Sequence, residues 1–206
     1  KFLMNNGIRP FRQEDIDKYF PPYPLKGDDP KMIEDQEKAD RVRRIERYKQ
    51  SKFPEKYFGV KLEDLAVEQK NIAEPFLTMI KEGKSASLWL CGKAGTGKTC
   101  LASAISKETC ILGKSVYYIK SHIIVEKLKK NQLSIDSLIY ELKQHDLVVI
   151  DEVGRYPLTE WESYYLFLIM DELYNKGISV IMISNLEKNK LGELLGAACV
   201  DRFKGI

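Results

Sequence analysis

The sequence lacks the features that would insert the chain in a membrane or crosslink it. No apolar run approaches the roughly 20 residues that a membrane helix needs, and we expect no signal peptide. The four cysteines, Cys91, Cys100, Cys110 and Cys199, form no Cys-x-x-Cys pair, which argues against a zinc site. We therefore expect a soluble, cytoplasmic protein with no membrane partner, whose cysteines are inert thiols in a reducing compartment.

The net charge is also small. It is +3, too little to indicate a nucleic-acid partner by itself. The basic residues are unevenly spread, however, and form two groups, each of which is either a solvated helix face or a contact for nucleic-acid phosphates. One group is Arg41, Arg43, Arg44, Arg47, Lys49, Lys52 and Lys56, and the other is Lys127, Lys129 and Lys130.

One glycine-rich motif stands out against this background. Residues 92–99 fit the pattern G-x-x-x-x-G-K-[ST] of the phosphate-binding loop. An apolar segment at 87–91 predicts a buried strand before the motif, and the residues after it predict an amphipathic helix. The predicted nucleotide-binding residues are Gly92, Lys93, Ala94, Gly95, Thr96, Gly97, Lys98, Thr99 and Cys100.

The residue types in this loop suit a nucleoside triphosphate. Glycines let backbone N–H groups turn inward around phosphates without side-chain clashes, and the helix N-terminus adds a partial positive charge. Lys98 can reach the β- and γ-phosphates, and Thr99 can place its hydroxyl on Mg²⁺. ATP and Mg²⁺ are therefore the expected cofactors.

Polar residues end two further apolar segments. Asp151 and Glu152 follow the apolar run 146–150; we expect Asp151 to hold Mg²⁺ and Glu152 to orient or deprotonate the attacking water. Asn185 follows the segment 179–184 and is a candidate contact for the γ-phosphate or its water. The alternative for Asp151 and Glu152 is a strand that simply meets solvent at two acids. The alternative for Asn185 is a turn residue that caps the next helix.

Strands and helices alternate along the chain, which predicts an α/β fold with a parallel sheet and helices on both faces. Ligands in such sheets bind at the carboxyl ends of the strands, where the loop, the two acids and Asn185 all fall. The predicted strands cover 87–91, 115–120, 146–151 and 178–184, and the predicted helices cover 98–112, 122–130, 135–143, 160–175 and 187–195.

Helix-capping signals support these boundaries. Ser121 and Ser134 are expected N-caps, and Thr159 with Glu162 predicts a capping box. Gly177 is expected to end the helix before it.

The first part of the chain has a different composition. Residues 1–56 predict a proline-rich linker and a charged, basic helix over 31–50 that Pro54 ends. The apolar stripe of this helix is thin, so we expect it to bury little. Residues 57–206 are expected to form the nucleotide-binding domain, with a further helix over 66–82.

The span from about Tyr57 to Arg202 resembles the AAA+ ATPases of the DnaC/DnaI helicase-loader type, which include the related IstB transposition helpers. The order and spacing of the later motifs carry this resemblance more than the phosphate-binding loop does. The matching pieces are residues 92–99, 113–116, 147–154, 171–174 with Gly177, 183–185, 195–196 and 201–202.

The resemblance implies roles for several residues. Asn185 matches the sensor asparagine, and Arg202 matches the arginine finger that acts on ATP held by the next subunit. The segment Ser121–Gln132 matches the part that contacts single-stranded DNA, so the expected DNA-binding residues are Lys127, Lys129, Lys130 and Trp161. The implied partners are a hexameric replicative helicase, single-stranded DNA and further copies of the chain, assembled on ATP or DNA.

The sequence also departs from this family. Ala197-Ala198 stands where many relatives have Glu-Arg, and the family's last core strand is missing after Ile206, so we expect a fragment or a truncated end. The motif at 156–158, Tyr-Pro-Leu, resembles the transposition helpers. The alternative function is therefore a helper ATPase that binds duplex DNA and recruits a transposase. A small-molecule kinase is a third class. It would need a substrate pocket and a lid with clustered arginines, and the segment after Asp151 offers only Arg155.

Overall fold

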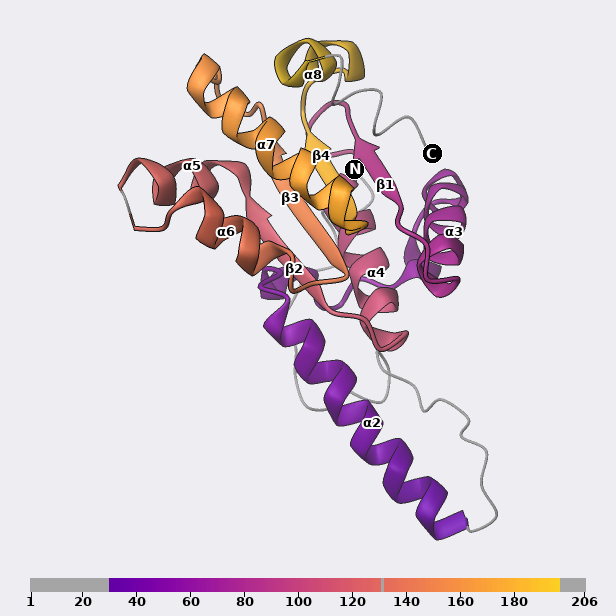
Figure 1. Ribbon diagram of the computed structural model, residues 1–206. Coiled ribbons are helices and arrows are strands. Elements are labelled where there is room, and N and C mark those ends of the chain that lie inside the picture. Colours follow the sequence, from indigo (N-terminus) through magenta and orange to yellow (C-terminus); the bar gives the residue numbers. More distant parts are fainter. Residues whose placement is uncertain (1–29, 131, 197–206) are drawn as a thin grey trace.

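The computed structural model describes residues 30–130 and 132–196 of the chain (Figure 1). The described part contains one sheet of four parallel strands in the order β1-β4-β3-β2. The predicted α/β fold is confirmed, and each strand lies within two residues of its predicted bounds. The strands are β1 (Ser87–Leu90), β2 (Val116–Lys120), β3 (Leu147–Val153) and β4 (Ser179–Ser184).

Helices cover both faces of this sheet because the strands are apolar on both sides. On β3, Leu147 and Val149 belong to one buried cluster, whereas Val148 and Ile150 belong to the other, as the two-residue period of a strand requires. The first cluster includes residues of α2 (Pro30–Gln50), α3 (Val67–Lys81) and α4 (Lys98–Ile111). The second includes residues of α5 (Ser121–Lys129), α6 (Ile135–Leu142), α7 (Glu160–Lys176) and α8 (Lys188–Leu195).

Several helix ends have the predicted caps. The Ser134 hydroxyl accepts the Ser137 amide at 3.1 Å. In the capping box at the start of α7, the Thr159 amide donates to Glu162 Oε2 at 2.8 Å, and the Glu162 amide donates to Thr159 Oγ1 at 3.3 Å. Gly177 ends α7 with a φ of 73°, a left-handed conformation that glycine adopts without steric cost.

The prediction for Ser121 is wrong. The N-cap of α5 is Lys120, and Ser121 is the first residue of the helix. Its hydroxyl donates to the Glu152 carbonyl at 2.9 Å and so joins α5 to the end of β3. A capping signal in the sequence does not show that a neighbouring strand offers the serine a different acceptor.

The expectation that the charged N-terminal helix buries little is wrong for its last turns. Figure 1 shows the first part of α2 extending away from the sheet and its end reaching β2. Tyr48 is 1 % exposed, and its hydroxyl lies 2.6 Å from Ser103 Oγ on α4. Its ring lies 4.8 Å from that of Phe58. The few apolar side chains are concentrated at the end of the helix, which an average over its whole length conceals.

The segment after α2 is attached to the sheet and to α4. The Tyr118 amide on β2 donates to the Ser51 carbonyl at 2.7 Å. The Lys107 ammonium on α4 donates to the carbonyls of Phe58, at 2.8 Å, and of Val60. Lys107 is 2 % exposed, and burial lowers its pKa to about 8. Its position in the sequence gives no sign of this, because lysine is common on exposed helix faces.

Lys107 makes the stability of the protein depend on pH. Between about pH 8 and 10.5, the unfolded chain binds a proton at Lys107 that the folded chain has released, so the contribution of Lys107 rises with pH in this window. We expect the free energy of unfolding of the wild type, minus that of Lys107→Met, to grow by about 2 kcal/mol between pH 7.5 and 9.5. Urea titrations of both proteins at several pH values measure this difference. A difference that stays constant would contradict the lowered pKa.

No helix among the described residues has the length and apolar character needed to cross a membrane. The free thiols in the same part of the chain are Cys91, Cys100 and Cys110, of which the last two are buried. The fourth cysteine, Cys199, lies outside the described residues.

Candidate nucleotide-binding site

The glycine-rich loop joins β1 to α4 at the carboxyl edge of the sheet. Gly97 precedes α4 with a φ of 83°, and Gly92 and Gly95 also have positive φ. The Gln69 amide nitrogen on α3 donates to the Thr96 carbonyl at 3.2 Å, and a Cβ at Gly97 would lie 2.7 Å from this nitrogen. The positive φ favours glycine at position 97, and a Cβ there would also displace the end of the Gln69 side chain.

Lys98 folds back over the loop. Its ammonium donates to the carbonyls of Gly92 and Lys93, each at 2.7 Å. Burial lowers the pKa of Lys98, and the charge of Asp151 partly offsets this effect. The ammonium is thus held by carbonyls that anionic phosphate oxygens can replace as stronger acceptors.

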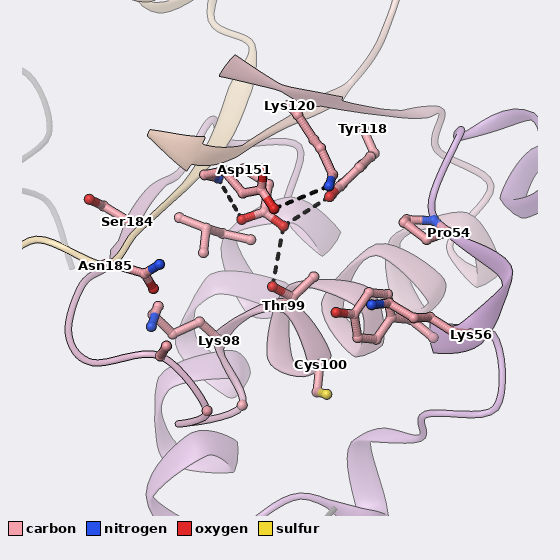
Figure 2. A pocket seen from close by; sticks show the side chains of 16 residues that line it. Pro54, Lys56, Lys98, Thr99, Cys100, Tyr118, Lys120, Asp151, Ser184 and Asn185 are labelled. Carbon is pink, nitrogen blue, oxygen red and sulfur yellow. Dashed lines mark hydrogen bonds and ion pairs between the residues drawn. The ribbon is translucent and has the colours of Figure 1, made fainter. Parts of the chain in front are cut away.

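The Asp151 carboxylate lies beside this loop at the end of β3 and is 5 % exposed. Its Oδ2 accepts the Thr99 hydroxyl at 3.2 Å and the Tyr118 hydroxyl at 2.9 Å, while its Oδ1 accepts the Glu152 amide at 2.7 Å. Figure 2 shows Thr99 and Tyr118 directed at this carboxylate from different elements.

The donor set fits Mg²⁺. A hydroxyl and a carboxylate are hard oxygen ligands, and protein sites for Mg²⁺ commonly use one or two such groups together with substrate phosphates and water. In the described residues no three His, Cys, Asp or Glu side chains form a metal-binding group. A transition-metal cage of that kind is therefore absent from this region, whereas the Thr99 and Asp151 oxygens match a site completed by nucleotide.

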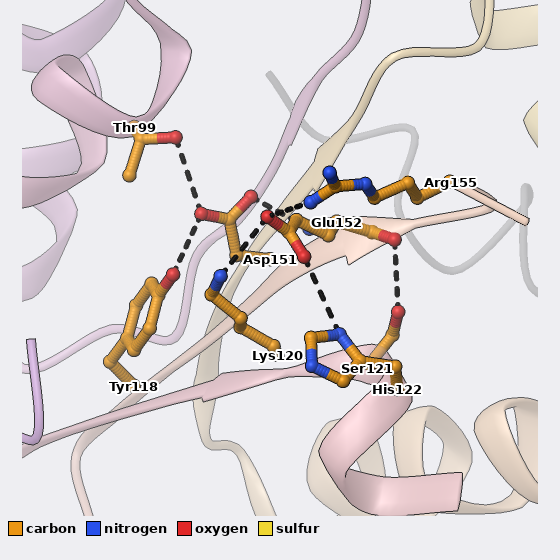
Figure 3. A network of polar contacts seen from close by, with 8 residues as sticks. All are labelled: Thr99, Tyr118, Lys120, Ser121, His122, Asp151, Glu152 and Arg155. Carbon is orange, nitrogen blue, oxygen red and sulfur yellow. Dashed lines mark hydrogen bonds and ion pairs between the residues drawn. The ribbon is translucent and has the colours of Figure 1, made fainter. Parts of the chain in front are cut away.

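Glu152 has an unusual backbone conformation. Its φ is 60°, which costs a non-glycine residue on the order of 1–3 kcal/mol, and the register of β3 with β4 shifts between Ile150 and Val153. This irregularity turns the side chain toward three nitrogen-bearing side chains (Figure 3). They are Lys120 at 3.1 Å and Arg155 at 2.7 Å from Oε1, and His122 Nδ1 at 3.4 Å from Oε2.

The neighbours of Glu152 lower the pKa of its carboxyl. Burial alone would raise its pKa, but the hydrogen bond and charge of Lys120, with Arg155 and His122, bring the pKa below its ordinary value. A general base must be unprotonated to accept a proton. Glu152 is therefore ionised at neutral pH, as a glutamate of ordinary pKa also is.

Asn185 reaches the same region from the end of β4. The Ser184 hydroxyl donates to the Val153 carbonyl at 2.7 Å and accepts the Leu186 amide at 3.0 Å. The Leu186 carbonyl in turn accepts the Gly92 amide at 3.2 Å. These bonds place Asn185 next to the glycine-rich loop (Figure 2).

A cavity of about 540 Å³ joins these elements. It brings together most of the expected site, but Gly92, Lys93 and Thr96 of the predicted loop are not among the residues that line it. Arg202 lies outside the described residues. The lining residues are Pro54, Lys56, Tyr57, Ala94, Gly95, Gly97, Lys98, Thr99, Cys100, Tyr118, Lys120, Asp151, Glu152, Ile183, Ser184 and Asn185.

Sequence reasoning missed several members of this site. Lys120 ends β2, the strand beside the acid-tipped β3, and a polar residue at that place was the available signal. Tyr118 carried no signal, because a tyrosine in an apolar strand is ordinary. Tyr57 lies three residues after Pro54, in a segment that lacks any nucleotide-binding motif.

The expected DNA-binding residues lie on α5, at its C-cap Lys130 and on α7. Lys129 pairs with Glu162 at 2.8 Å, and Lys130 pairs with Glu126 on its own helix. Trp161 is 40 % exposed, and its ring lies 4.4 Å from that of Tyr165. The structure brings Lys129 and the start of α7 together through Glu162.

The fold and this site define a class of protein. A glycine-rich loop between a strand and a helix, a lysine folded over it, and a threonine bonded to a strand-end aspartate are the parts of a P-loop ATP-binding protein of the AAA+ type. The sequence profile described as IstB-like ATP binding protein matches residues 29–202. The chain belongs to this family.

Similar curated proteins are helicase loaders and a transposon protein. The replicative helicase loader DnaC of Buchnera aphidicola is 31 % identical over 124 residues, covering 58 % of this chain and 50 % of that protein. DnaC of Escherichia coli K12 is 32 % identical over 127 residues, covering 60 % of this chain and 52 % of that protein. The insertion sequence IS5376 putative ATP-binding protein of Geobacillus stearothermophilus is 26 % identical over 133 residues, covering 64 % and 52 %. The chain thus spans about half the length of these relatives.

Solved structures share the fold. The crystal structure of the DnaC helicase loader superimposes with a TM-score of 0.61 at 23 % identity, covering 72 % of this chain and 94 % of that one. The replication initiator DnaA bound to AMPPCP and single-stranded DNA superimposes with a TM-score of 0.59 at 26 % identity, covering 71 % and 48 %.

We expect Lys98→Ala to lose most of its affinity for ATP, because a charge-assisted contact in a partly buried site is removed. Lys84→Ala is the control: it removes the same charge from an exposed position that lines a separate hollow. Isothermal titration calorimetry should show at least about a tenfold loss, or 1.4 kcal/mol, for Lys98→Ala only. Equal binding by both variants would contradict the assignment of the loop.

Proposed function

We propose that this chain is the ATP-hydrolysing part of a loader that attaches a hexameric replicative helicase to single-stranded DNA. The observation that carries the ATPase part is the Thr99 hydroxyl bonded to Asp151, 3.2 Å away, beside the folded Lys98. The curated relatives named DnaC support the loader part. The proposal concerns the whole protein, of which the matched region is about half in those relatives.

In this proposal each residue of the site has one task. The loop amides and Lys98 bind the phosphates, and Thr99 with Asp151 holds Mg²⁺, which when bound neutralises charge on the phosphate oxygens. Glu152 orients the attacking water and accepts its proton. Asn185 contacts the γ-phosphate or that water.

Hydrolysis also involves neighbouring subunits in this proposal. Arg202 acts as the finger that stabilises charge on ATP bound by the next copy of the chain. Arginine fingers of other NTPases are worth about 10³–10⁵ in rate. Turnover is therefore expected to need assembly of several copies on ATP or DNA.

We expect Glu152→Gln to bind ATP normally but to hydrolyse it at least about 100-fold more slowly, because the water loses its base. The amide keeps the shape of the side chain, and Asp151 is untouched. Phosphate release measures turnover, and calorimetry measures binding. Glu82→Gln, the same substitution at an exposed position that does not line the cavity, is the control and should retain most turnover. Wild-type hydrolysis by Glu152→Gln would assign the base to another residue.

Single-stranded DNA is proposed to lie along α5 and the start of α7. Lysines neutralise backbone phosphates, and exposed aromatic rings offer stacking platforms for bases. Lys127, Lys129 and Lys130 supply the first feature, and Trp161 supplies the second. A DnaA structure of similar fold is described as bound to single-stranded DNA, which supports single-stranded DNA as the ligand.

We expect the triple variant Lys127→Ala, Lys129→Ala, Lys130→Ala to weaken binding of a labelled oligonucleotide and to reduce its salt dependence. Three lost phosphate contacts lower the slope of log K against log salt by about 2 for a single strand. The control removes the same charge from Lys84, Lys114 and Lys143, which line a separate hollow. Fluorescence anisotropy at several salt concentrations measures both. Equal slopes in the two variants would show that the α5 lysines form a solvated face.

The partner distinguishes the proposed function from its alternative. A transposition helper would bind duplex DNA and recruit a transposase, and the Tyr-Pro-Leu motif at 156–158 and the IS5376 relative are the features that favour it. The whole protein should co-purify with a hexameric helicase and load it on single-stranded DNA in the presence of ATP. Co-purification with a transposase instead would overturn the loader proposal.

A further inference from the structure

Tyr118 is a buried tyrosine that contacts the carboxylate expected to hold the metal. It comes from β2 and is 6 % exposed. Its hydroxyl donates to Asp151 Oδ2 at 2.9 Å, the same oxygen that accepts the Thr99 hydroxyl at 3.2 Å. Figure 3 shows these two donors approaching Asp151 from separate elements.

Packing fixes the place of this hydroxyl. The Tyr118 ring lies 4.4 Å from that of Phe53, at an angle of 41°. Its amide donates to the Ser51 carbonyl at 2.7 Å. Phenylalanine would fill this position equally well if packing were the sole requirement. The bond from the Tyr118 hydroxyl to Asp151 therefore points to a role in the site.

The neighbouring tyrosine has a different surrounding. Tyr117 belongs to the cluster on the other face of the sheet. Its hydroxyl donates to Glu141 Oε1 at 2.8 Å and accepts the Lys52 ammonium at 2.7 Å. The two adjacent tyrosines thus make the same kind of bond to a carboxylate, one inside the nucleotide cavity and one away from it.

The chemistry of Mg²⁺ binding separates the roles of the two donors on Asp151. A threonine that ligates Mg²⁺ offers a lone pair of its hydroxyl oxygen to the cation. The Tyr118 hydroxyl carries no such task and can remain a donor to Asp151. Groups that hold a metal-ligating carboxylate in this way set the orientation of the ligand and so tune metal affinity.

We propose that Tyr118 is a positioning residue for the metal site: its hydroxyl holds the Asp151 carboxylate beside Thr99, so that Mg²⁺ finds both protein oxygens in place. This inference rests on the proposed Mg²⁺-dependent binding of ATP. Tyr118 acts through Asp151 and contacts no reacting atom in this scheme.

Tyr118→Phe removes the hydroxyl and keeps the ring against Phe53. The experiment titrates Mg²⁺ into the whole protein with ADP that carries a fluorescent N-methylanthraniloyl group, and repeats the nucleotide titration in EDTA. We expect the Mg²⁺ concentration for half-maximal enhancement of binding to rise about tenfold, with affinity in EDTA unchanged. Tyr117→Phe is the matched control and should behave as wild type in both titrations.

The possible results are distinguishable. A Mg²⁺ requirement in Tyr118→Phe equal to that of wild type overturns the positioning role. An equal loss of affinity with and without Mg²⁺ also overturns it, because the hydroxyl would then shape the cavity and not the metal site. A wild type whose nucleotide binding does not respond to Mg²⁺ overturns the proposed function and this inference together. The EPR signal of Mn²⁺ in the nucleotide complex gives a second readout, and an unaltered signal in Tyr118→Phe counts against the proposal.

Discussion

The hydrogen bonds on the Asp151 carboxylate are the constraint on which the site depends. A carboxylate that is 5 % exposed is costly to bury unless donors surround it. Its donors come from three places in the sequence: Thr99 on α4, Tyr118 on β2 and the adjacent Glu152 amide. The ends of β2 and β3 and the start of α4 must therefore meet at one point, and this point lies beside the glycine-rich loop.

The order of the strands determines what surrounds this point. Because β3 lies between β4 and β2, the acids at its end have Asn185 on one side and Lys120 on the other. On the β2 side Lys120 pairs with Glu152, while Asn185 faces the loop on the β4 side. The division of roles between the two acids thus follows from sheet topology as well as from their sequence positions.

Topology also explains what the sequence could predict. The glycine-rich loop and the acid-tipped strand were predictable because each is a local pattern with a local physical reason, and the strands were predictable because β3 and β4 are continuous apolar runs. The roles of Tyr118 and Lys120 depend on β2 pairing with β3, which no local pattern encodes. Burial of Lys107 depends likewise on a distant segment folding over α4 and offering it carbonyls.

That segment connects the charged N-terminal helix to the nucleotide cavity. The Tyr48 hydroxyl at the end of α2 lies 2.6 Å from Ser103 Oγ. The Ser103 hydroxyl in turn donates to the Tyr57 carbonyl at 3.0 Å. Tyr57 lines the cavity, and Tyr48 belongs to the same buried cluster as residues of α4. Close-packed interiors transmit displacement because their side chains have few alternative positions. The end of α2 and the wall of the cavity are consequently one packed unit, although in the sequence they belong to a charged helix and a separate apolar segment.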